Sequence, residues 1–161
     1  MIFEHAIESI VVLCAGRSLR FSGGPKCLAP AGGTPMLAHV IEPFRPYCKK
    51  WVFVTAPGDI AVKRFILSMD IESEIVIQPD PIGMTDATLR GAARAGRRFG
   101  LLLGDCFIRG AFDAEKAFEN AAGVWAAAAA RDISENYGVE VREGMITRAE
   151  EKPRDTAGLL C

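Results

Sequence analysis

The chain has 161 residues, half of them apolar and 24% charged, which is the size and composition of one soluble globular domain. Its formal net charge of −1 excludes nucleic-acid binding driven by overall charge. The five cysteines form no CxxC pair, which indicates neither a disulfide framework nor a zinc site and favours a reducing cytoplasm. The start of the chain lacks the pattern of a signal peptide, and no apolar run is long enough for a membrane span.

Short apolar runs alternate with segments of helical periodicity along the first two-thirds of the chain. We expect strands at residues 9–14, 51–55, 74–78 and 100–104, and helices at residues 36–44, 60–69, 85–96 and 113–122. Residues 124–130 fit a buried strand or a helix, and residues 137–142 and 145–150 fit a hairpin around Glu143-Gly144. The alternation predicts an α/β fold with a mostly parallel sheet and helices on both faces.

An apolar run at residues 10–13 leads directly into a loop of small residues and cations that reaches Lys26. Small residues let backbone N–H groups approach phosphate oxygens, and cations neutralise charge that builds up during phosphoryl chemistry. Arg20 and Lys26 are the candidate cations, because Arg binds phosphate in a bidentate manner and Lys supplies a point charge. A solvated basic loop is the alternative interpretation.

Two further candidates follow later predicted strands, at the edge where ligands bind to parallel sheets. Asp105 ends a buried strand after Gly104 and can hold Mg²⁺, which needs few protein ligands; a turn or capping Asp is the alternative. Gln78 can recognise the edge of a base through its amide, and Gly83 leaves space for that base; an ordinary Pro-rich turn is the alternative.

The last candidates surround the predicted hairpin. They are Tyr137-Gly138 at its start and Glu151-Lys152 at its end. The carboxylate of Glu151 can accept hydrogen bonds from sugar hydroxyls, and Lys152 can hold a second phosphate. A charge cluster on the surface is the alternative.

Taken in order, these segments resemble the sugar-phosphate nucleotidyltransferases, also called nucleoside-diphosphate-sugar pyrophosphorylases. The resemblance extends over nearly the whole chain. It lies at residues 13–20, 25–26, 28–30, 33–37, 39–41, 78, 83–87, 103–105, 137–139 and 150–153. Each piece is common by itself, and the ordered set is specific.

The resemblance implies a Rossmann-like nucleotidyltransferase fold with a mostly parallel mixed sheet. It implies transfer of a nucleoside monophosphate from an NTP to a sugar 1-phosphate, with release of pyrophosphate. By the same resemblance Arg20 and Lys26 are catalytic, and Asp105 binds Mg²⁺. Nucleotide contacts are implied for Leu13, Ala15, Gly16, Gln78, Gly83 and Thr85, and acceptor contacts for Tyr137, Gly138, Glu151 and Lys152.

The chain departs from the family pattern in its loop and in its length. Ser18-Leu19 occupy the usual Gly-Thr position, and the compact loop is closer to acetylglucosamine-phosphate uridylyltransferases and molybdenum-cofactor guanylyltransferases. Family domains usually continue past the Glu-Lys-Pro segment, so we expect one domain that lacks the usual C-terminal part. Three interpretations stay open: a sugar nucleotidyltransferase, transfer to another phosphorylated acceptor such as molybdopterin, and a non-catalytic or regulatory homologue. A homo-oligomer or a partner subunit is a further way to complete the site.

Overall fold

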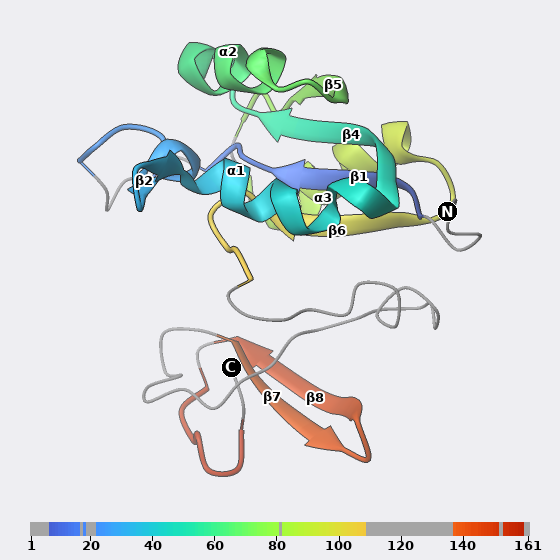
Figure 1. Cartoon of the computed structure of the whole chain (residues 1–161). Helices are drawn as coiled ribbons and strands as arrows, with labels where there is room; N and C mark the ends of the chain where they lie inside the picture. The colour runs from blue at the N-terminus through green and yellow to red at the C-terminus, as the bar shows by residue number, and fades with distance from the viewer. Residues whose placement is uncertain are drawn as a thin grey trace. The chain divides into compact units, whose positions relative to one another are not determined.

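A computed structural model of the chain describes residues 7–16, 18, 22–80, 82–108, 137–151 and 153–159, with the backbone alone at Tyr137 and Glu151. The chain divides into two compact units, Met1–Asn120 and Ala121–Cys161. Figure 1 shows the helices and strands of each unit. The single domain expected from the sequence stays a prediction.

The first unit contains a parallel sheet of four strands in the order β5-β4-β1-β6. The strands are β1 (Ile7–Leu13), β4 (Cys48–Thr55), β5 (Glu72–Ile77) and β6 (Phe99–Leu103). Every adjacent pair is parallel, and Leu13 at the end of β1 pairs with Val54 on one side and Leu103 on the other. The predicted α/β fold with a parallel sheet is confirmed, and the carboxyl ends of the strands meet at one edge.

Helices cover both faces of this sheet. They are α1 (Met36–Ile41), α2 (Ile60–Ser68) and α3 (Met84–Ala95). Figure 1 shows α1 in front of the sheet and α3 behind it. Because successive strand residues point to opposite faces, Val12 packs in the core with α1 and α2, whereas Val11 packs with α3. A Cβ atom at Gly91 would overlap the Val11 side chain, so this glycine lets α3 lie close to the sheet.

Short elements connect the strands to the helices. They are the 3₁₀ helices η1 (Lys26–Leu28) and η2 (Glu42–Tyr47), and a small hairpin of β2 (Pro30–Ala31) and β3 (Thr34–Pro35). The prediction of one helix over residues 36–44 is wrong, because α1 ends at Ile41 and η2 follows. Pro43 explains the change: proline lacks an N–H for the helical ladder, and its ring crowds the preceding turn.

The other strands and helices predicted within the described residues of the first unit are present, with ends that differ by three residues at most. The predicted helix at residues 113–122 and the ambiguous segment 124–130 lie outside the described residues. Within the part of the chain that the structure describes, no helix is both long enough and apolar enough to cross a membrane.

The described part of the second unit contains an antiparallel hairpin. Its strands are β7 (Tyr137–Arg142) and β8 (Met145–Glu151). The two turn residues, Glu143 and Gly144, both have positive φ, at 51° and 76°, as two-residue hairpin turns require. The hairpin predicted around Glu143-Gly144 is confirmed.

Candidate active site

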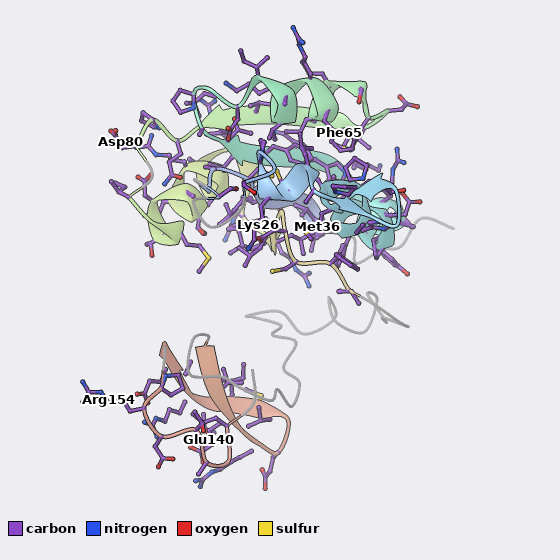
Figure 2. All side chains as sticks on the ribbon, turned by 90° about the vertical axis from the view of Figure 1, so that its left-hand side faces the viewer. Lys26, Met36, Phe65, Asp80, Glu140 and Arg154 are labelled. Atoms are coloured by element: carbon purple, nitrogen blue, oxygen red, sulfur yellow. The ribbon has the colours of Figure 1, made fainter. Side chains whose placement is uncertain are left out.

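Lys26 and Asp105, 79 residues apart in sequence, meet at the carboxyl edge of the parallel sheet. The Nζ atom of Lys26 donates to Oδ2 of Asp105 at 3.0 Å. The two side chains are 56% and 31% exposed, so a ligand can reach both. Figure 2 looks onto this edge, with Lys26 near the middle of the first unit and Asp80, from the loop after β5, at one side. An accessible cation beside an accessible carboxylate suits a polyphosphate and its metal ion.

Ser18 helps to hold Lys26 in place. The backbone N–H of Lys26 donates to Oγ of Ser18 at 3.0 Å, which closes the loop on itself. The φ of Ser18 is 49°, in the left-handed region where glycine is favoured. The serine therefore adopts a backbone conformation that glycine adopts more readily, and its hydroxyl serves as a hydrogen-bond acceptor. Arg20, the other predicted loop cation, lies outside the described residues.

Gly104 positions Asp105 beside the loop that carries Lys26. Its N–H donates to the carbonyl oxygen of Leu13 at 2.9 Å, one residue past the end of β6. A Cβ atom on Gly104 would lie 2.7 Å from Sγ of Cys14 and 3.0 Å from the Leu13 oxygen, closer than packed atoms tolerate. The absence of a side chain at Gly104 therefore lets the Asp105 turn pack against the start of the loop.

Two buried thiols lie at the start and at the end of the loop. Cys14 follows β1 directly, and Cys27 follows Lys26 in η1. The hydrogen bond with Cys27, together with burial, raises the pKa of the Cys14 thiol well above its ordinary value, and the same bond lowers the pKa of Cys27. Both thiols are buried next to the loop that carries Lys26. Sequence reasoning missed this pair, because twelve residues separate the two cysteines.

Gln78 is held at the end of β5, facing the first turn of α3. The side chain is buried, and its Nε2 donates to the carbonyl oxygen of Gly83 at 3.0 Å and to Oδ2 of Asp86 at 2.9 Å. The same Asp86 oxygen accepts from Nε of Arg90 at 2.7 Å. The hydrogen bond from Arg90, and next the one from Gln78, lowers the pKa of Asp86. Sequence reasoning selected Gln78 and Gly83 but missed Asp86 and Arg90, whose helical i,i+4 spacing was the available signal.

The other residues predicted to contact the nucleotide differ in their exposure to solvent. Ala15 is buried in the core beside α3. Leu13 is half-buried, and its carbonyl oxygen already accepts from Gly104. Gly16 and Thr85 are exposed, and a Cβ atom at Gly16 would meet no atom within 4 Å.

Asp105 is the residue that fits a magnesium ion. Its carboxylate supplies hard oxygen donors, and a cation, the Lys26 ammonium, already lies beside one of them. Among the described residues there is no cluster of three or more His, Cys, Asp or Glu side chains arranged to hold a metal. Magnesium is commonly bound through one or two carboxylates with water and substrate phosphates completing its shell, so Asp105 is compatible with that mode of binding.

The predicted acceptor contacts lie in the second unit. Tyr137 pairs with Glu151 across the hairpin, and Gly138 pairs with Glu150. A Cβ atom at Gly138 would lie 2.7 Å from Cδ1 of Leu159 and 2.9 Å from Cγ of Pro153. Gly138 therefore has a packing role in this unit, whatever it binds. Lys152 lies outside the described residues.

The chain belongs to the MobA-like NTP transferase domain family, which matches residues 10–139. Its sheet, its helices and its loop at the carboxyl edge are thus those of a nucleotidyltransferase domain. No curated protein sequence matches the chain.

Solved structures of low sequence identity share the fold. HddC from Yersinia pseudotuberculosis has a TM-score of 0.73 at 16% identity, over 95% of this chain and 73% of its own. The inositol-1-phosphate CTP transferase from T. maritima has a TM-score of 0.69 at 17% identity, over 96% and 68%. A Bacillus anthracis protein described as a glucose-1-phosphate thymidylyltransferase, in complex with a sucrose, has a TM-score of 0.74 at 15% identity, over 96% and 68%.

Proposed function

We propose that the chain is a Mg²⁺-dependent nucleotidyltransferase that transfers a nucleoside monophosphate from an NTP to a sugar 1-phosphate. The observation that carries the proposal is the exposed pair of Lys26 and Asp105, 3.0 Å apart at the carboxyl edge of the sheet. The family supports the use of an NTP. The sugar 1-phosphate is supported by the sequence resemblance and by a neighbour described as a glucose-1-phosphate thymidylyltransferase.

The proposed reaction is an in-line displacement at phosphorus. An oxygen of the acceptor phosphate attacks the α-phosphorus of the NTP, and the bond from that phosphorus to the oxygen bridging to the β-phosphate breaks. Pyrophosphate leaves with the electron pair of the broken bond. Negative charge grows on the phosphate oxygens, and the Lys26 ammonium is the described cation able to offset it. Arg20 stays the second predicted cation of this step.

Asp105 would hold the magnesium ion, which supplies positive charge against the triphosphate. In the structure Oδ2 of Asp105 accepts a hydrogen bond from Lys26. The same oxygen could instead bind the magnesium ion. When Asp105 binds a metal ion instead, the Lys26 ammonium is free to bind a phosphate. The ion pair therefore keeps Lys26 close to its proposed place of action before substrate binds.

An acceptor panel tests this proposal. The whole chain is incubated with Mg²⁺, an NTP labelled at the α-phosphate, and one acceptor at a time: sugar 1-phosphates, molybdopterin, or phosphorylated alcohols. We expect label to move onto a sugar 1-phosphate. Label on molybdopterin or an alcohol phosphate would show that the acceptor is not a sugar 1-phosphate, while the proposed transfer of a nucleoside monophosphate would stand. Tight binding of nucleotides or nucleotide-sugars with no transfer to any acceptor would identify a regulatory homologue.

Transfer to a non-sugar acceptor is the second candidate function. It is favoured by the MobA-like family and by the compact loop between Arg20 and Lys26. The same panel separates it from the first candidate. For either function we propose the cytoplasm as the compartment, because NTPs are available there and Cys14, Cys27, Cys48 and Cys106 are free thiols.

A further inference from the structure

The carboxamide of Gln78 has one orientation that its surroundings permit. Both of its neighbours, the Gly83 carbonyl oxygen and the Asp86 carboxylate, are acceptors, at 3.0 Å and 2.9 Å from Nε2. A flipped carboxamide would place Oε1 against these two oxygens, which would repel it and lose both hydrogen bonds. The two N–H groups of Gln78 are therefore taken by Gly83 and Asp86, and Oε1 is the polar atom of the side chain that remains for a ligand.

Asp86 is the residue that makes this orientation strict. Its Oδ2 accepts from Gln78 and from Nε of Arg90, and its place in the first turn of α3 favours a negative charge. The two hydrogen bonds and the position at the N-terminal end of α3 keep Asp86 ionised at neutral pH. An ionised carboxylate can only accept hydrogen bonds. Because Asp86 cannot donate, Gln78 cannot turn its oxygen toward Asp86.

We propose that Asp86 is a positioning residue that presents the carbonyl oxygen of Gln78 to the nucleotide, and so selects bases that donate a ring N–H. This inference rests on the proposed function, in which Gln78 contacts the base. Guanine offers N1–H, and uracil or thymine offers N3–H. Cytosine and adenine have an unprotonated ring nitrogen at the matching position, whose lone pair would face the lone pairs of Oε1. The chain thus takes GTP, UTP or dTTP in preference to CTP and ATP.

Binding of modified nucleotides tests the inference on the whole chain. Titration calorimetry with Mg²⁺ compares GTP and UTP with CTP and ATP, and with N1-methyl-GTP and N3-methyl-UTP. Loss of one hydrogen bond to a buried partner corresponds to a change in affinity of about tenfold or more. We expect methylation of the preferred nucleotide to lower its affinity by about tenfold or more. We expect CTP and ATP to bind more weakly than the preferred nucleotide by at least the same factor.

Two variants separate positioning from a general structural effect. Asp86→Ala removes one of the two acceptors that hold Nε2 of Gln78 and leaves only the Gly83 carbonyl oxygen, so we expect the preference for a ring N–H to fall several-fold. Arg90→Gln removes the other partner of Asp86 and leaves its bond with Gln78, so we expect that preference to be kept. Equal loss of preference in both variants would overturn the role given to Asp86.

A measurement on the nucleotide-free protein keeps the inference testable if the Asp86 variant does not fold. In NMR spectra of the native chain, the two Nε2 protons of Gln78 should exchange slowly with solvent and differ in shift. Rapid exchange of that pair would overturn the fixed orientation. Equal affinity for methylated and unmodified nucleotide would overturn this inference alone. Failure to bind any NTP would overturn the inference together with the proposed function.

Discussion

The two polar groups at the carboxyl edge of the sheet are built in different ways. Lys26 and Asp105 share a single contact between exposed side chains, and such pairs contribute only about 0–1 kcal/mol to stability. Gln78 is buried and bonded to Gly83 and Asp86, and Asp86 is bonded again to Arg90. The Lys26–Asp105 pair, proposed for chemistry, can therefore rearrange at little cost, whereas Gln78, proposed for recognition, is held in place before a ligand arrives.

Removal of either charge in the Lys26–Asp105 pair should give the largest effect. We expect Lys26→Met or Asp105→Asn to lower kcat by roughly 10²-fold or more, because the first removes a cation that offsets the charge growing in the transition state and the second weakens binding of the proposed Mg²⁺. Steady-state kinetics of pyrophosphate release measure the change. Stability should change little, since the pair is exposed.

Lys49→Met is the matched control for the lysine variant. Lys49 is exposed near the start of β4, at the opposite end of the strands from Lys26. Its replacement should leave kcat within about twofold of the native value. If Lys26→Met and Lys49→Met behave alike, the chemistry lies elsewhere in the chain.

Gly104→Ala should destabilise the turn that carries Asp105. The added Cβ would lie 2.7 Å from Sγ of Cys14 and 3.0 Å from the Leu13 oxygen, so atoms must shift, at a cost of about 1–3 kcal/mol in the free energy of unfolding. Urea denaturation measures it. Gly58→Ala is the control, because a Cβ there meets nothing within 4 Å; equal destabilisation of the two variants would contradict the close packing at Gly104.

A pair of substitutions at Ser18 separates strain from hydrogen bonding. Ser18→Ala and Ser18→Gly both remove the Oγ that accepts from the Lys26 N–H, but only glycine relieves the left-handed backbone at φ 49°. We expect the glycine variant to be more stable than the alanine variant by about 1 kcal/mol in urea denaturation. Equal stabilities would show that the loop does not need the left-handed conformation.

The smallest expected effect is a change in acid stability at Asp86. Hydrogen bonds from Arg90 and Gln78 hold the pKa of Asp86 below its ordinary value of 3.8. Its stabilisation is therefore fully present above that value and is lost as pH falls through the lower folded pKa. Asp86→Asn should lower stability at neutral pH and flatten the loss of stability below about pH 4. Unfolding midpoints at pH 3, 4 and 7 measure this, and parallel curves for the two proteins would contradict it.

Most of the described fold was predictable, because local patterns determine it. Four apolar runs with helical segments between them specify a parallel α/β sheet, and Glu143-Gly144 marks the hairpin. The error at residues 36–44 came from following apolar spacing past Pro43, although this proline removes a helical donor.

The candidate site was predictable as a set of strand ends but not in its contacts. Parallel strands place their carboxyl ends at one edge, which brings Lys26 and Asp105 together across 79 residues. The left-handed conformation of Ser18 and the orientation of Gln78 depend on distances between side chains, for which one sequence carries no signal. The roles of Tyr137, Gly138 and Glu151 toward an acceptor stay predictions, as do those of Arg20 and Lys152.

Pyrophosphate release by the whole chain is the most direct test of the proposed function. The assay supplies Mg²⁺, each NTP in turn and a panel of sugar 1-phosphates, and compares the native chain with Asp105→Asn. We predict release that requires both substrates and falls by roughly 10²-fold or more in the variant. Native-level release by Asp105→Asn, or no release by the native chain with any pair of substrates, would contradict it.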